Sequence, residues 1–195
     1  GVFILPLDPV IVRWTNRPKF PGYPMPPRLT NVPAEESFDK LTLRAGWDKD
    51  DDYLLIQGFG SGSHGHPDAN TISQYQRRGR VLLHDSDYIR RMPKNHNGIM
   101  VIRDGKHDWI PLNAELIAAQ ETAFGAVTQS RLIDYNGCDW LRTIVWLRND
   151  CVIVIDTLGA KTAGEYALRC YWRTLGDAQL AGRHMHADHA GEHFH

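Results

Sequence analysis

The chain has 195 residues, of which 42% are hydrophobic and 23% are charged, so it can bury a sizeable core and has the composition of an ordinary globular protein. Its formal net charge of -1 gives no electrostatic case for binding nucleic acid or an anionic membrane surface. No apolar run reaches the ~18 residues that a membrane helix needs, and no segment has the pattern of a secretory signal. The three cysteines are an odd number inside apolar runs, which predicts buried free thiols and not a disulfide framework: Cys138, Cys151 and Cys170.

The N-terminal part is rich in proline between residues 15 and 37, which disfavours both a helix and a central strand there. We therefore expect residues 1–37 to be a linker or a strap laid on a surface. The chain starts without Met and ends in GEHFH, which has the pattern of an interrupted strand. We expect a piece of a longer protein, with any export signal outside it.

From residue 38 onward the pattern changes to short strand-like runs separated by turn residues. Period-two alternation is clearest over residues 139–158, where Asn149 and Asp150 predict a tight turn between two strands. The only weak helical candidate is Glu115 to Gln120. An all-β antiparallel sandwich over residues 38–195 is therefore expected, with about ten strands. The runs are 41–47, 52–59, 71–76, 80–85, 98–104, 114–124, 126–135, 139–150, 151–158, 165–176 and 178–188.

The stretch GFGSGSHGHPDANTI, residues 58–72, alternates histidine with glycine. Flexible glycines can bring the imidazoles of His64 and His66 close to one point, and Pro67 then stiffens the exit from the loop. Asp68 follows directly. Such a loop fits either a metal site or polar histidines that hydrogen-bond the backbone.

A metal needs ligands from elsewhere in the chain, and the next ones lie at the ends of later strands. Asp85 or Asp87 stands at the end of the strand-like run RVLLHD, and His96 stands in PKNHNG. Two histidines and an aspartate form a typical three-ligand set for zinc, with one position left for water or substrate. His84 precedes Asp85 on a strand, so it should point to the opposite face and be structural.

Four features occur together between residues 38 and 107: an Arg, Gly, Trp strand, a Gly-x-His-x-His-x-Asp-x-Asn loop, an aspartate that ends the next apolar strand, and a His-Asn pair before another apolar strand. This set resembles the heparinase II/III-like family of polysaccharide lyases. The later segment YWRTLGDAQLAGR is similar to the family's following sandwich strands. The family fold is an α/α toroid followed by a β-sandwich, and this chain resembles only the sandwich.

The resemblance implies zinc held by His66, Asp85 and His96, with His64 facing the substrate cleft. It also implies β-elimination on a uronate-containing acidic polysaccharide. The proton beside the carboxylate is weakly acidic, so its removal needs fixed positive charge or hydrogen-bond donors and a base of tuned pKa. His64 can supply part of that neutralisation. The base would come from the missing toroid, so this part alone is expected to be inactive.

The chain departs from the family pattern in two ways. The segment between Asp85 and His96 is short, and Gly98 stands where the family commonly has threonine or serine. Within that short segment, Tyr88 and Arg90 can touch a sugar acid, or they can be surface residues of a turn.

The C-terminal tail holds five of the ten histidines, on alternating positions that suit either a second metal site or the polar face of a hairpin: His184, His186, His189, His193 and His195.

Trp140 and Trp146 share one strand face, which predicts core packing. Trp47 and Trp109 are nearer the loop and are the better candidates for sugar contact.

Three hypotheses follow: the sandwich part of a zinc-containing lyase, which the motifs favour, a carbohydrate-binding module, and a structural domain. The binding module would hold oligosaccharide without forming unsaturated product, and the structural domain would bind neither metal nor sugar. The expected partners are acidic polysaccharide and the toroid of the same protein, with no nucleic acid and no membrane, and a homodimer stays open. Resemblance implies a periplasmic or secreted location.

Overall fold

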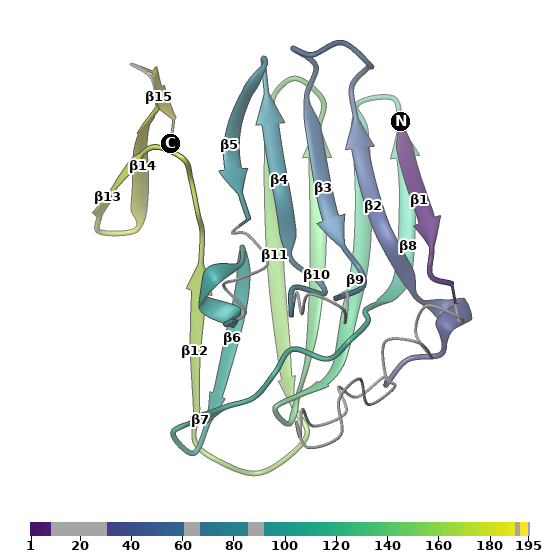
Figure 1. Ribbon diagram of the computed structural model, residues 1–195, viewed down its shortest axis with the longest axis vertical. Coiled ribbons are helices and arrows are strands. Elements are labelled where there is room, and N and C mark those ends of the chain that lie inside the picture. The colour runs from purple at the N-terminus through teal and green to yellow at the C-terminus, as the bar shows by residue number, and fades with distance from the viewer. Residues whose placement is uncertain (9–30, 61–66, 86–91, 190–191, 195) are drawn as a thin grey trace, which may run out of the picture.

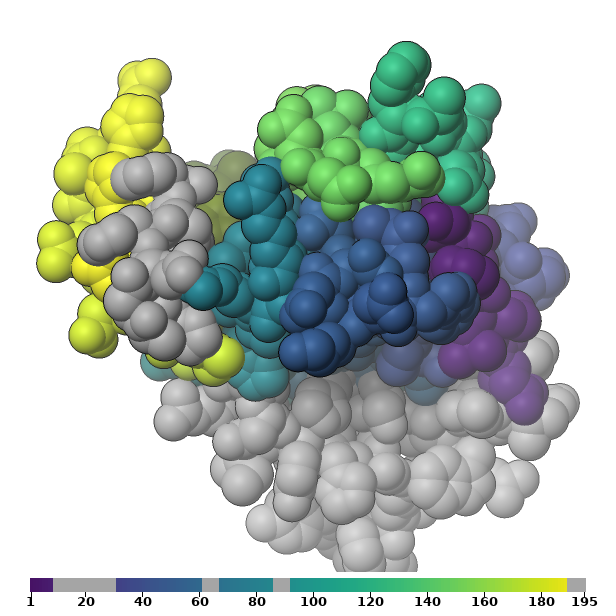
Figure 2. Space-filling model, turned by 90° about the horizontal axis from the view of Figure 1, so that it is seen from above, coloured from purple at the N-terminus to yellow at the C-terminus, as the bar shows by residue number. Residues whose placement is uncertain are grey.

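The computed structural model describes residues 1–8, 31–60, 67–85, 92–189 and 192–194. Its strands form two sheets packed face to face, with smaller sheets at one side (Figure 1). Viewed from above, the green layer of β8–β11 lies over the blue and teal layer of β2–β5, and the yellow C-terminal strands lie to the side (Figure 2). The prediction of an all-β antiparallel sandwich is confirmed.

The first sheet has five antiparallel strands in sequence order, and the second has four in the order β11-β10-β9-β8. The first sheet contains β1 (Val2–Pro6), β2 (Phe38–Arg44), β3 (Tyr53–Gln57), β4 (Ile72–Arg77) and β5 (Arg80–His84). The second contains β8 (Glu115–Thr122), β9 (Gly125–Tyr135), β10 (Cys138–Leu147) and β11 (Cys151–Ala160).

Two three-stranded sheets complete the described fold, in the orders β12-β6-β7 and β13-β14-β15. They contain β6 (Gly98–Arg103), β7 (Lys106–His107), β12 (Tyr166–Tyr171), β13 (Asp177–Ala181), β14 (His184–His189) and β15 (Glu192–Phe194). Two short 3-10 turns, η1 (Ala34–Glu36) and η2 (Pro93–Asn95), interrupt the strands. No helix in the described ranges is long and apolar enough to cross a membrane.

The core lies between the two large sheets, and strict alternation in β10 builds its centre. Every second residue of β10 is buried, including Trp140 and Trp146, which are 0% and 1% exposed. These rings pack with Leu41 and Leu43 of β2 and Leu54 of β3 in one apolar cluster. The prediction that both tryptophans are core residues is confirmed.

The β10–β11 hairpin also forms where the sequence predicts it. Leu147 pairs with Cys151, and Asp150 N–H donates to Leu147 O over 3.0 Å. Asn149 has a φ of +59°, a left-handed conformation that asparagine tolerates better than most residues.

Three expectations need correction. Glu115 to Gln120 is not helical but belongs to β8, because cross-strand pairing with β9 overrides the helix propensity of its Ala, Glu and Gln residues. Within the expected strap 1–37, Val2–Pro6 is instead an edge strand paired with β2. Of the three free thiols, Cys138 is buried, whereas Cys151 is half-buried and Cys170 is exposed.

Candidate metal centre

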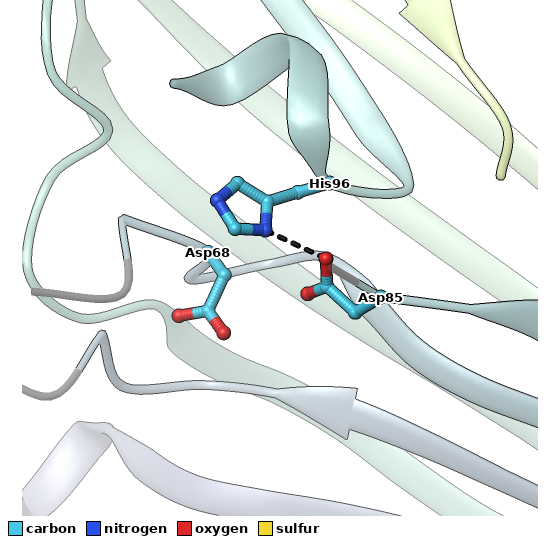
Figure 3. A group of neighbouring side chains, drawn as sticks. All are labelled: Asp68, Asp85 and His96. Carbon is cyan, nitrogen blue, oxygen red and sulfur yellow. Dashed lines mark hydrogen bonds and ion pairs between the residues drawn. The ribbon is translucent and has the colours of Figure 1, made fainter. Parts of the chain in front are cut away.

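Three side chains from separate segments converge beside the end of the first sheet (Figure 3). Asp68 precedes β4, Asp85 directly follows β5, and His96 follows η2. Their ligand atoms all lie within 4.8 Å of one another, and all three residues are buried. Asp68 and Asp85 are 17 residues apart in the sequence, and the β4–β5 hairpin brings them together because it returns Asp85 to the start of β4, where Asp85 N–H donates to Ser73 O over 2.8 Å.

His96 and Asp85 form the tightest contact in the group. The distance between His96 Nδ1 and Asp85 Oδ1 is 2.7 Å, and His96 is fully buried. If Nδ1 carries the proton, its N–H donates a hydrogen bond to the Asp85 carboxylate, and the Nε2 lone pair is left for a metal ion. Nε2 is itself buried and has no hydrogen-bond partner among the described residues.

A compact turn holds Asp68. Thr71 donates to Asp68 O twice, from its hydroxyl over 2.6 Å and from its backbone N–H over 3.1 Å. Inside the turn, Asn70 has a φ of +66°, which suits asparagine. The Asn70 backbone N–H then donates to Gln57 O at the end of β3 over 2.7 Å. The turn is thus tied to the first sheet.

A second asparagine, Asn97, fixes the segment that carries His96. Its side-chain amide donates to Ile72 O over 2.9 Å, and its Oδ1 accepts from the Arg173 backbone N–H over 2.6 Å. Its carbonyl accepts from the Ile72 N–H over 3.2 Å. The Asn of the predicted His-Asn pair is therefore a structural link between β4, β6 and the segment after β12.

The group fits a divalent cation. Two carboxylates buried this close to one another repel, and a cation or proton between them offsets that repulsion. Carboxylate oxygen and imidazole nitrogen are both ordinary zinc ligands. The donor set and its burial both match such a site.

Of the residues singled out from the sequence, the structure brings Asp85 and His96 together. It adds Asp68, which the sequence analysis noted only as part of the loop. The other predicted site residues lie outside the described residues: His64, His66, Asp87, Tyr88 and Arg90.

Four further residues named from the sequence can also be placed. His84 is exposed while Asp85 is buried, so the predicted opposite orientation of these neighbours is confirmed. Trp47 is exposed in the β2–β3 connection, and that connection is at the opposite end of β3 from the Gln57–Asn70 hydrogen bond. The prediction that Trp47 is near the loop is therefore wrong. His184 and His186 are exposed on β14.

No family model and no curated protein matches the sequence. Among solved structures, the fold is similar to heparan sulfate lyase HepC from Pedobacter heparinus, with a TM-score of 0.65 and 17% identity over 80% of this chain and 26% of that chain. A structure of heparinase III matches with a TM-score of 0.61 and 15% identity over 80% of this chain and 27% of that one. The chain spans about a quarter of the length of these proteins. At these identities the likeness shows a shared β-sandwich fold.

Proposed function

We propose that the chain is the β-sandwich portion of a zinc-containing lyase that cleaves uronate-containing acidic polysaccharide by β-elimination. The observation that carries the proposal is the buried group of Asp68, Asp85 and His96, on a fold shared with lyases of heparan sulfate. His66 stands two positions before Asp68 and is proposed as a further ligand. A periplasmic or secreted location, which the resemblance to the lyase family implies, is part of the proposal.

In this proposal, Asp85 orients the His96 ring through the 2.7 Å contact, and Asp68 adds a second buried negative charge beside it. The bound zinc would supply fixed positive charge and join three separate chain segments. His64 would donate a hydrogen bond to the uronate carboxylate, which lowers the barrier for removal of the adjacent proton. The proton-abstracting base would come from the toroid of the same protein.

Metal analysis of the purified chain tests the centre. We expect about one zinc per chain by mass spectrometry in the wild type, and loss of zinc in Asp85→Asn and His96→Ala. His84→Ala is the matched control, because His84 adjoins Asp85 but is exposed. Wild-type protein without metal, or His96→Ala with full zinc, would contradict the proposed centre.

The substrate class is tested on the full-length protein with uronate polysaccharides, by the rise in ultraviolet absorbance that accompanies the unsaturated product. The expected result is a rise with wild type that His64→Ala reduces. Oligosaccharide binding without any such rise would favour a carbohydrate-binding module instead. Zinc without sugar binding or product would leave a structural role for the metal and contradict the lyase.

A further inference from the structure

A buried arginine lies in the middle of β10, where an apolar residue would be expected. Arg142 alternates with Trp140 and Ile144 on the inward face and is 0% exposed. Its guanidinium carbon is 4.7 Å from the Trp140 ring centroid and 5.7 Å from that of Trp172. Fully buried arginines are rare unless their donors are satisfied.

One side of the guanidinium is neutralised by Asp156 of β11. Nε donates to Asp156 Oδ1 over 2.8 Å and Nη2 donates to Oδ2 over 2.9 Å, so the pair is bidentate. The Trp140 indole N–H also donates to Oδ1, over 2.8 Å. These contacts fix the plane of the guanidinium relative to β10 and β11.

The other side joins two segments that are distant in the sequence. Nη1 donates to Asn70 O over 3.1 Å and to Asn97 O over 3.0 Å. Asn70 stands two positions after Asp68, and Asn97 directly follows His96. Arg142 Nη1 therefore holds the backbone close to two residues of the candidate centre, Asp68 and His96.

From this geometry we infer that Arg142 is a positioning residue for the metal centre, setting the separation between the Asp68 turn and His96. The inference rests on the proposed function, since it assigns a role toward the same centre. Lysine cannot replace it, because an ammonium group lacks the planar fork that meets two carboxylate oxygens and two carbonyls at once.

The energetics of buried ion pairs favour positioning over simple stabilisation. Replacing a complete buried pair by apolar residues of similar volume is often neutral or stabilising, whereas removing one partner is strongly destabilising. The ion pair of Arg142 and Asp156 is therefore weak evidence for a purely stabilising role. Its distinctive contribution is the link from a rigid strand pair to two separate loops.

Zinc affinity, measured by competition with a chromophoric chelator, tests the inference. We expect Arg142→Lys to weaken zinc binding by about tenfold, the lower end of the loss for groups that hydrogen-bond a metal ligand directly, because Arg142 acts through the carbonyls of Asn70 and Asn97. Arg131→Met is the control, because the Arg131 guanidinium pairs with Glu115 over 2.7 Å on the neighbouring strand β8. If Arg142→Lys does not fold, the double variant Arg142→Met/Asp156→Leu replaces it, with the same expected loss of affinity. Unchanged affinity in a folded Arg142 variant would overturn the inference.

Nitrogen NMR of the His96 ring in metal-free protein separates this inference from the metal proposal. Wild type and Arg131→Met should show one set of ring nitrogen signals, as expected for a ring held by Asp85. The folded Arg142 variant should show shifted or multiple signals, because the ring is no longer held in one position. Identical His96 signals in all three proteins would overturn the inference, even if the wild type bound no metal.

Discussion

Gly98 packs directly against the edge of the Trp140 indole. A Cβ atom at position 98 would lie 2.9 Å from Trp140 Cη2 and 3.0 Å from Thr71 Cγ2. This contact explains why a residue without a side chain stands at position 98. The space that a side chain would fill is taken by a core tryptophan.

Substitution of Gly98 should therefore destabilise the fold. We expect Gly98→Ala to lower the free energy of unfolding by about 1–3 kcal/mol, the usual cost of overpacking a core. Gly159→Ala is the control, since Gly159 is at an exposed position of β11 and a Cβ there would meet nothing within 4 Å. Urea denaturation of both variants measures the difference, and equal stabilities would show that Trp140 can move aside.

Zinc should stabilise the native state by mass action. At a free zinc concentration 100 times the dissociation constant, the free energy of unfolding should rise by about 2.7 kcal/mol. A chelator should remove this gain in the wild type and should not lower the melting temperature of His96→Ala. Calorimetry with and without chelator makes the comparison, and a wild type insensitive to chelator would contradict the proposed centre.

Alkaline pH should destabilise the fold through buried tyrosines. Burial raises the pKa of Tyr75 to about 12, and the nearby carboxylate of Asp52 adds to the shift. Burial also raises the pKa of Tyr135. The unfolded state releases these protons near pH 10, so stability is retained below pH 10 and falls as the pH rises toward 12.

Denaturation between pH 8 and 11 checks this, with Tyr75→Phe as the diagnostic variant. Its slope of stability against pH should be shallower above pH 10 than that of the wild type, because one tyrosine no longer contributes. Both proteins should behave alike near pH 8. Parallel slopes across the whole range would exclude Tyr75 as a contributor.

The free thiols should differ in reactivity. Cys170 is exposed on β12, whereas Cys138 is buried at the start of β10. Burial raises the pKa of the Cys138 thiol, so Cys138 should react more slowly than free cysteine at pH 8. Modification by a thiol reagent, followed by peptide mapping, should label Cys170 first and Cys138 only on unfolding. Early labelling of Cys138 would contradict its burial.

Local patterns were sufficient to predict much of the fold. The alternation in β10, the turn at Asn149 and the opposite orientations of His84 and Asp85 all depend on a strand period of two, which is visible in the sequence. The strand β8 was harder to predict, because its residues have helical propensity and only pairing with β9 makes it extended.

The candidate centre was only partly predictable for a similar reason. Asp85 and His96 stood out as residues at strand ends, but the place of Asp68 beside them depends on the turn that Thr71 closes. Arg142 gave one local signal, a charged residue at an inward position between Trp140 and Ile144. Its partners Asn70 and Asn97 are 72 and 45 residues away, and no periodicity identifies such contacts.

The bond from the Arg173 backbone N–H to Asn97 Oδ1 also bears on the order of folding. It joins positions 76 residues apart. It also lies next to the pairing of β6, which begins directly after Asn97, with β12, which ends two residues before Arg173. Contacts this distant in sequence require the closure of long loops and form slowly. During synthesis, the segment holding His96 cannot acquire its final anchoring until residue 173 has left the ribosome. We therefore expect the candidate centre to form late, after the β2–β5 meander, in which strands adjacent in the sequence pair with each other.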